Sequence, residues 1–361
     1  MSVDGAQLPA MMVSFGNGIK LKNLLKEGST AVTLYFAEIA IAQPSNQLSE
    51  FSSRGPAVNI GIKPDILAVG GDVSTATQSK FPDGGSYDRR GYTVLDGTSF
   101  SAPAIAGAMA VVKGARPGLN SAQYRSLIVN SASPMILSNG TVAPVMMAGA
   151  GLLDLDAAVR NTTVLAPVTM SFGVGGLNPE MSRMVEVTNL ASESDTFSIT
   201  IQSTDTLSAT AEPATLEIPA RETRKFNLNF QGKDIANGEY QGFVKIKGVN
   251  SPVESRMPYW YAAPTYKPAT VRIITQSLTG TVNSSQTFGC VLLDATGIPI
   301  SGVRPEVKVT SGGGRFDGLL SLEPKNPGVW SVLVKLGVSA GPNVFRITSG
   351  DANRDVTIEG Q

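Results

Sequence analysis

Histidine is absent from this 361-residue sequence, and its absence restricts function more than any other property of the composition. Without imidazole, no site built from this sequence alone can use histidine as a general base, a proton shuttle or a metal ligand. Cysteine occurs once, at Cys290, so neither an internal disulfide nor a thiolate metal cluster can form. Cys290 lies in an apolar strand pattern, where we expect a buried, small hydrophobic residue.

Long hydrophobic runs and an excess of one charge are also missing. The longest apolar run, residues 102–112, has eleven residues, whereas a membrane-spanning helix needs about 20. The 29 basic residues cancel the 29 acidic ones, which removes the electrostatic attraction that a nucleic acid or an anionic membrane requires. No basic segment followed by an apolar stretch comes after Met1, so the sequence shows no signal peptide. We expect no membrane span and no nucleic-acid partner.

The length and the remaining composition indicate several β-rich domains. At about 150 residues per domain, the chain is expected to form two to four. The sequence is 42% apolar and contains 38 glycines and 22 prolines, which indicates real hydrophobic cores joined by many turns. Charged residues make up only 16%, and this profile is typical of extracellular β modules.

The first half of the chain has an α/β pattern. Residues 8–36 predict a strand, a helix and a strand, a piece too short to close a core alone. Residues 102–112 are apolar on every face, which predicts a helix buried inside a larger body. Asn120 and Gln123 have the spacing of a capping box, and they predict the start of a helix with one apolar stripe.

Beyond residue 161 the hydrophobic period changes to two, which predicts antiparallel strands. Turn signals separate these strands at the intervals expected of β-sandwiches of about 100 residues. Residues 262–268 contain two prolines and are interpreted as a linker between two sandwiches. The alternation is carried by Phe197, Ile199, Ile201, Phe226, Leu228, Phe230, Tyr240, Val244 and Ile246 before the linker, and by Trp330, Val332, Val334 and Leu336 after it.

The segment DGTSFSAPAIAGAMAVV, residues 96–112, carries the candidate chemistry. Ser99 stands just before a predicted helix, where it would meet the positive end of the helix dipole. Its own backbone N–H could then stabilise a developing oxyanion, so Ser99 is a candidate nucleophile. The alternative is that Ser99 or Ser101 merely caps the helix, which is the commoner role for serine at such a position. Position alone favours the cap.

The literal residues change that weighting, because this segment resembles the serine motif of subtilisin-like serine proteases (subtilases). The family motif is Gly-Thr-Ser-x-Ser/Ala-x-Pro followed by Ala-Gly, and it is matched here by Gly97, Thr98, Ser99, Ser101, Pro103, Ala106 and Gly107. Ala104 replaces a histidine that the family usually has after the proline and that is not catalytic. Three further segments resemble the family in the correct order: FSSRGP (51–56), KPDILAVG (63–70) and GAGLLDLDAAV (149–159).

The resemblance implies a multidomain architecture. Residues 1–46 resemble the end of a protease-associated domain. Residues 47–162 resemble the carboxy-terminal part of a subtilisin-like catalytic domain, with a parallel sheet and a buried helix that bears the serine. Residues 163–264 resemble a fibronectin type III-like sandwich, and residues 265–361 a bacterial immunoglobulin-like sandwich.

The resemblance also implies a secreted serine endopeptidase that acts on peptide or protein substrates. Ser99 would be the nucleophile and the backbone oxyanion donor, and Gly97, Thr98, Ser101 and Pro103 would support its turn. The family's catalytic aspartate and histidine and its oxyanion asparagine lie upstream of the matched segments, and this sequence has no counterpart of them. We therefore expect the carboxy-terminal part of a larger protease, inactive without its missing amino-terminal part. The alternative is a non-catalytic scaffold or adhesion protein that retains a truncated protease remnant.

Other polar and aromatic residues have simpler interpretations. Asp65, Asp72, Asp83 and Asp88 offer the carboxylates that calcium prefers, but their irregular spacing favours ordinary loop residues, so no cofactor is expected. A lysine can act as the base for a serine nucleophile, but Lys113 lies too far along the predicted helix to deprotonate Ser99. Trp260 and its flanking tyrosines are compatible with carbohydrate stacking, but an aromatic cluster that packs a domain junction is favoured.

Overall fold

The computed structural model describes residues 15–26, 28, 47–83, 86–203, 205–275 and 278–361. The chain divides into two compact units, Met1–Ser45 and Asn46–Gln361. In the first unit, α1 (Phe15–Lys26) corresponds to the helix predicted between two strands. Apart from Phe15, the flanking strands predicted at 8–15 and 32–36 lie outside the described residues, as does most of the predicted protease-associated segment 1–46.

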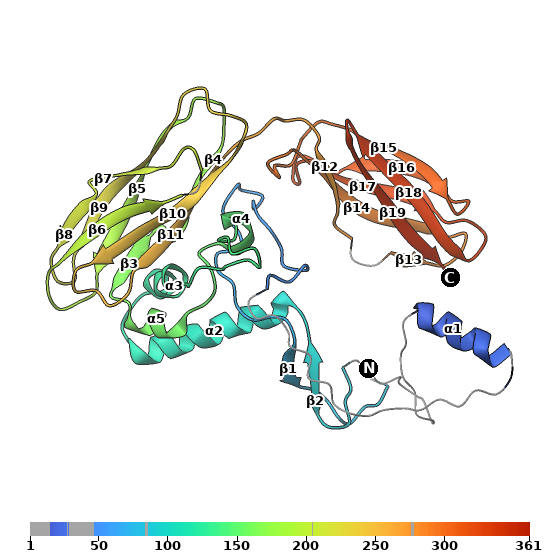
Figure 1. The fold of residues 1–361 in the computed structure, drawn as a ribbon, viewed down its shortest axis with the longest axis horizontal. Helices are drawn as coiled ribbons and strands as arrows, with labels where there is room; N and C mark the ends of the chain where they lie inside the picture. Colours follow the sequence, from blue (N-terminus) through green and yellow to red (C-terminus); the bar gives the residue numbers. More distant parts are fainter. Residues whose placement is uncertain (1–14, 27, 29–46, 84–85, 204, 276–277) are drawn as a thin grey trace. The chain divides into compact units, whose positions relative to one another are not determined.

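The second unit begins with a mixed region, residues 47–162, called here the serine segment (Figure 1). Its elements are β1 (Val73–Ala76), β2 (Tyr92–Leu95), α2 (Thr98–Ala115), α3 (Ser121–Asn130), α4 (Val145–Ala148) and α5 (Leu155–Arg160). Strands β1 and β2 pair in an antiparallel fashion, with Val73 opposite Leu95. Within the described part of this segment, the parallel pairing is an isolated bridge between Leu67 and Leu152. The parallel sheet predicted for this region is therefore not confirmed.

Helix α2 is less buried than its sequence predicted. It spans the apolar run, but its fully buried residues are only Ala108 and Val112, which pack against α3 and α5. On another face, Val111 is 51% exposed. Apolarity on every face indicates that a helix requires cover all round, and the described residues cover one stripe. The prediction of a buried serine-bearing helix is therefore wrong for α2 within this structure.

Helix α3 confirms its sequence signals. The Asn120 side chain accepts a hydrogen bond from the Gln123 N–H at 2.9 Å, and the Gln123 side chain accepts one from the Asn120 N–H at 2.9 Å. This reciprocal capping box satisfies two N–H groups that the first turn leaves without helical acceptors. The apolar stripe of Tyr124, Leu127 and Ile128 is buried.

Residues 163–263 form two antiparallel-rich sheets that share one core, called here the first sandwich. The first sheet has the order β4-β11-β10-β6-β8, and the second β3-β5-β9-β7. Their bounds are β3 (Thr163–Ala166), β4 (Met170–Val174), β5 (Glu180–Asn189), β6 (Asp195–Gln202), β7 (Thr210–Glu212), β8 (Thr215–Ile218), β9 (Thr223–Gln231), β10 (Gly238–Gly248) and β11 (Ser255–Ala263).

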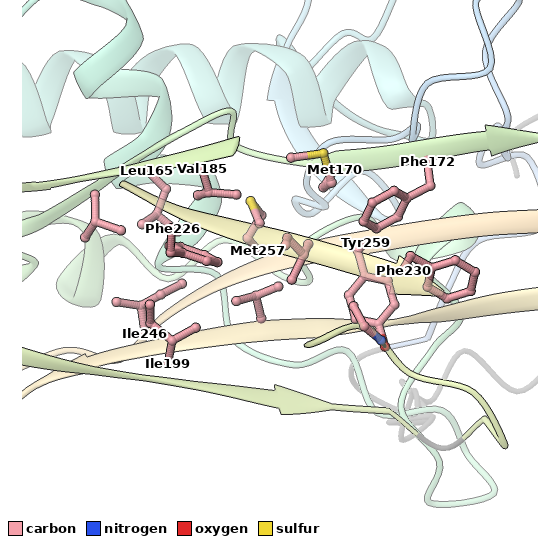
Figure 2. Packing of buried hydrophobic residues seen from close by; sticks show 14 of the residues in the cluster. Leu165, Met170, Phe172, Val185, Ile199, Phe226, Phe230, Ile246, Met257 and Tyr259 are labelled. Atoms are coloured by element: carbon pink, nitrogen blue, oxygen red, sulfur yellow. Dashed lines mark hydrogen bonds between the residues drawn. The ribbon is translucent and has the colours of Figure 1, made fainter. Parts of the chain in front are cut away.

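The core of the first sandwich confirms the alternation predicted from the sequence. Along β9, Phe226, Leu228 and Phe230 point inward and are buried, while the residues between them face outward. Figure 2 shows Phe226 and Phe230 among buried residues of the facing sheet, including Ile246 and Tyr259. The Phe230 ring lies 5.1 Å from the Tyr261 ring, within the range of favourable aromatic pairs.

Residues 270–360 form a second pair of sheets, called here the second sandwich. Their orders are β12-β14-β17-β16 and β13-β19-β18-β15. The strands are β12 (Thr270–Ile273), β13 (Thr279–Gly280), β14 (Ser285–Leu293), β15 (Glu306–Ser311), β16 (Arg315–Ser321), β17 (Val329–Lys335), β18 (Gly341–Ser349) and β19 (Ala352–Gly360). Cys290 is fully buried in this core, and burial raises the pKa of its thiol to about 11.

Buried polar side chains join the serine segment to the first sandwich. From α3, the Asn130 side-chain amide donates to the backbone oxygens of Val168 at 2.8 Å and Arg256 at 3.0 Å. Its oxygen accepts from the Ser126 hydroxyl at 2.9 Å, and this hydroxyl in turn accepts from the N–H of Leu165 at 2.7 Å. Satisfied buried networks of this kind fix the orientation of packed elements, because each group left without its partner would cost free energy.

Candidate active site

Ser99 is the second residue of α2, and its side chain is exposed. Its backbone N–H belongs to the first helical turn, whose N–H groups have no acceptor within the helix. The first turn contains no acidic residue, so its positive dipole end is not neutralised from within the helix. The exposed hydroxyl and the first-turn N–H therefore lie at a position suited to an oxyanion.

Gly97 fixes how the chain enters α2. Its φ angle is 154°, in the range that L side chains rarely adopt. The Gly97 N–H donates to the Gly70 carbonyl at 2.7 Å, and its own carbonyl accepts from the Phe100 N–H at 3.0 Å. A Cβ at Gly70 would lie 2.8 Å from the Gly97 oxygen and would overlap the Ser101 hydroxyl. Two glycines in close contact therefore shape the turn that presents Ser99.

The other motif residues have separate roles around this turn. The Ser101 hydroxyl donates to the Ala68 carbonyl at 3.0 Å, which attaches the first turn of α2 to residues 68–70. Pro103 lies inside α2 and has no N–H, so the Ser99 carbonyl lacks its usual helical donor four residues later. Thr98 is the first residue of the helix and is exposed. The structure thus brings the predicted motif residues together at one helix end.

The sequence analysis missed one contact between the residues that flank the β1–β2 hairpin. The Asp96 carboxylate, directly before Gly97, accepts a hydrogen bond from the Asp72 N–H at 2.6 Å. This bond joins the residue after β2 to the residue before β1 and closes the hairpin next to the serine turn. Asp96 is the first residue of the segment 96–112, but its partner 24 positions earlier could be found only in the three-dimensional structure.

The side chains considered as alternative bases or metal ligands lie elsewhere or have other partners. Lys113 lies 14 positions after Ser99, and at about 1.5 Å per residue the two are about 21 Å apart along α2. Asp65 forms ion pairs with Lys63 at 2.6 Å and Arg125 at 3.1 Å. Asp88 pairs with Arg90, and the side-chain hydrogen bond from that arginine lowers the Asp88 pKa. Within the described ranges, no group of three His, Cys, Asp or Glu side chains is placed to hold a metal ion.

Trp260 has the structural role that was favoured for it. Its side chain is fully buried among Ile62 and Met146 of the serine segment, Phe243 of the first sandwich and Ile298 of the second. A buried indole presents no face for carbohydrate stacking. The prediction of a packed junction is therefore confirmed for Trp260, but the flanking Tyr259 and Tyr261 belong to the core of the first sandwich.

None of the described helices is both long and apolar enough to cross a membrane.

Comparison with known proteins connects this geometry to a family. Residues 6–175 match the Subtilase family, peptidase S8. The Minor extracellular protease Vpr of Bacillus subtilis (strain 168) is 28% identical over 253 residues, an alignment that covers 68% of this chain and 30% of the relative. A PI-type proteinase of Lactococcus lactis subsp. cremoris is 27% identical over 316 residues, covering 70% and 16%. The Subtilisin-like protease SBT4.4 of Arabidopsis thaliana is 27% identical over 262 residues, covering 69% and 34%.

The chain spans about a third or less of the length of these curated relatives. The family match covers the whole serine motif and ends one residue after β4 of the first sandwich. The glycine-shaped turn and the exposed serine at the start of α2 lie inside it. Residues 6–175 thus carry a subtilase (peptidase S8) domain, with subtilisin-like proteases among its homologues.

Proposed function

We propose that this chain supplies the nucleophile of a subtilisin-like serine endopeptidase. The Ser99 hydroxyl would attack the carbonyl carbon of a peptide bond, and the Ser99 N–H would stabilise the oxyanion that forms. The observation that carries this proposal is that Ser99 is exposed at the start of α2, directly after the turn at Gly97. Ser99 also lies within the residues that match the subtilase family. A serine that only caps α2 would need neither this turn nor the rest of the motif.

Attack by Ser99 through a Ser-His-Asp mechanism needs a histidine that this sequence does not contain. Its composition includes no histidine, so the base of a Ser-His-Asp mechanism must come from residues outside it. The aspartate that orients the base and a second oxyanion donor would come from the same source. Loss of these groups reduces catalysis by about 10³- to 10⁶-fold. The described chain alone should therefore have no measurable peptidase activity.

The exposed apolar residues near Ser99 and farther along α2 are where the complementary polypeptide would pack. Val69 and Val94, on the loop and the strand before the serine turn, are 69% and 59% exposed, and Val111, 12 positions after Ser99 on α2, is 51% exposed. Soluble proteins rarely leave large contiguous apolar patches uncovered. A polypeptide that covers α2 would bury this surface and bring the base to Ser99 in one step.

The remaining parts of the proposal follow the resemblance. Residues 1–46 would be the end of a protease-associated domain and 47–162 the carboxy-terminal part of the catalytic domain. Residues 163–264, which include the first sandwich, would be a fibronectin type III-like domain. Residues 265–361, which include the second sandwich, would be an immunoglobulin-like domain. Both would brace the protease or contact surfaces. Because the name of the Vpr relative describes an extracellular protease, we place this protein outside the cell, with peptides or proteins as substrates and no resident cofactor.

The test is fluorophosphonate labelling of Ser99. We expect the reading frame upstream of codon 1 to encode an aspartate, a histidine and an asparagine motif. The chain alone should remain unlabelled, and the chain joined to that upstream segment should be labelled. Ser99→Ala should abolish labelling, whereas Ser121→Ala, which removes an exposed hydroxyl at the start of α3, should leave it unchanged.

Failure of this test would favour the non-catalytic alternative. A stop codon and an unrelated gene upstream, or a joined protein that folds but is not labelled, would contradict the peptidase proposal. The chain would then be better described as a scaffold or adhesion protein that retains a protease remnant. Labelling that persists in Ser99→Ala would assign the nucleophile to another residue.

A further inference from the structure

Glu239 accepts a hydrogen bond from Trp260 at the junction, and the carboxylates of Asp205 and Asp294 are near enough to repel a negative charge on it. Glu239 lies on β10, Asp205 in the loop after β6, and Asp294 directly after β14. Glu239 and Asp205 belong to the first sandwich, whereas Asp294 belongs to the second. In the described part of the chain, none of the three forms an ion pair with a lysine or arginine. Negative charge is therefore concentrated at a contact between domains without a neutralising partner there.

Two of these carboxylates hold backbone N–H groups at the junction. Asp205 accepts a hydrogen bond from the Gln241 N–H, and the Gln241 side chain accepts one from the N–H of Val145, the first residue of α4, at 2.6 Å. Asp294 is buried and accepts from the N–H of Thr265 in the linker at 2.8 Å. Asp205 thus supports the contact with the serine segment, and Asp294 supports the linker to the second sandwich.

Glu239 has a weaker set of contacts than these two aspartates. Among the described residues, its carboxylate accepts one hydrogen bond, from the Trp260 indole N–H at 3.3 Å. Asp205 and Asp294 both repel a negative charge on it. Burial first, and then these two neighbours, raise the Glu239 pKa above its ordinary value of 4.5, against the opposing effect of the Trp260 hydrogen bond.

We propose that Glu239 is a proton-controlled contact: while its carboxyl is protonated, the serine segment and both sandwiches stay packed around Trp260, and when it ionises this packing loosens. The direction follows from linkage. A carboxyl whose pKa is raised in the folded state stabilises the packed form at low pH, and this contribution is lost as the pH rises through the folded-state pKa. Ionisation places a negative charge in a half-buried site close to two other carboxyl groups, and burial raises the pKa of one of them, Asp205, as well.

The packing around Trp260 makes this contact measurable. The sequence has two tryptophans, and Trp330 lies in the second sandwich with a buried N–H that has no hydrogen-bond partner among the described residues. A Trp330→Phe background therefore leaves Trp260 as the sole tryptophan, which can be excited selectively, and removes an unsatisfied donor. Acrylamide quenching of the full chain, measured from pH 4 to pH 8, then reports access to the junction.

We expect Trp260 to be shielded in acid and to become more accessible as the pH rises, with one midpoint above pH 4.5. Glu239→Gln should abolish this rise and keep Trp260 shielded throughout, because the amide cannot ionise. Glu217→Gln, at an exposed position of β8 in the same sandwich, should leave the quenching profile unchanged. Far-UV circular dichroism confirms that each variant is folded at the pH values compared.

A second variant tests the role of the neighbouring charge. Asp205→Asn keeps an oxygen that can accept from the Gln241 N–H but removes one repelling charge, so the midpoint should move to lower pH. The proposal is overturned if folded Glu239→Gln retains the wild-type profile, if Trp260 becomes more accessible in acid, or if the wild-type profile is flat. These outcomes do not depend on Ser99, so they leave the peptidase proposal untouched.

Discussion

The first sandwich and the serine segment bury their apolar residues to very different degrees. Phe230 on β9 is fully buried between two sheets of its own domain, whereas Val111 on α2 is 51% exposed. Strand β9 alternates apolar with polar residues, whereas α2 is apolar over most of its length. The sandwich closes its core with its own strands, but α2 finds cover from α3 and α5 along one stripe only. The comparison shows that one region closes its own core and that the other leaves apolar surface of α2 uncovered.

The largest expected effect lies in the region that closes its own core. Phe230→Ala removes a ring that packs against Phe172 and Tyr261, and it should lower the free energy of unfolding of the first sandwich by about 3–5 kcal/mol. Urea denaturation in the Trp330→Phe background would follow this sandwich through Trp260. Phe288→Ala in the second sandwich is the matched control and should leave the Trp260 transition in place. Equal shifts from both variants would mean that the two cores unfold as one.

The next effect lies at the contact between the two regions. Asn130→Ala removes the amide that donates to the Val168 and Arg256 carbonyls and leaves buried acceptors without a partner. We expect a loss of about 1–3 kcal/mol, together with faster amide hydrogen exchange in α3. Asn353→Ala, at an exposed position of β19, is the control. Protection of α3 that stays unchanged in Asn130→Ala would show that apolar packing alone holds the contact.

A smaller effect belongs to the cap of α3. Asn120→Ala removes the acceptor for the Gln123 N–H, and we expect a cost of about 1 kcal/mol in the stability of the serine segment. Asn120→Asp keeps an acceptor and should retain most of the stability. Hydrogen exchange of the first turn of α3 measures both variants. If the two variants behave alike, the capping box has no energetic role.

The smallest effect distinguishes the two regions most directly. Val111→Lys replaces an exposed apolar side chain on α2, so it should change the stability of the described chain by no more than about 0.5 kcal/mol. In a protein joined to its upstream segment, the same change should prevent assembly or fluorophosphonate labelling. Lys113→Ala on the same helix is an exposed control. A joined protein that tolerates Val111→Lys would show that this face of α2 stays uncovered.

Much of the fold could be predicted because its signals are local. The period-two alternation of Phe226, Leu228 and Phe230 requires one buried face, and the sheet supplies it. The capping box of α3 depends on two residues three positions apart. The serine motif was recognised from adjacent residues, and the structure places them at one helix end. The assignment of Ser99 as nucleophile stays a prediction until labelling tests it.

Other features depend on residues that are distant in the sequence. No pattern predicts that Asn130 bonds to Arg256, 126 positions away, or that Glu239 accepts a hydrogen bond from Trp260. The burial of α2 was predicted wrongly because hydropathy reports what a helix requires and not whether a neighbour is present. Arg256 shows the same limit: its charged side chain is buried with the guanidinium 3.6 Å from the Phe243 ring centre.

The sequence by itself determined the strand alternation, the helix cap, the serine motif and the impossibility of a histidine base, because each is a property of residue type and short spacing. Only the tertiary structure decided which face of α2 is covered, how Gly70 and Gly97 contact each other next to Ser99, and which carboxylate accepts a hydrogen bond from Trp260. These are contacts between segments far apart in the chain, and their free energies depend on distance and burial, which residue order alone does not specify.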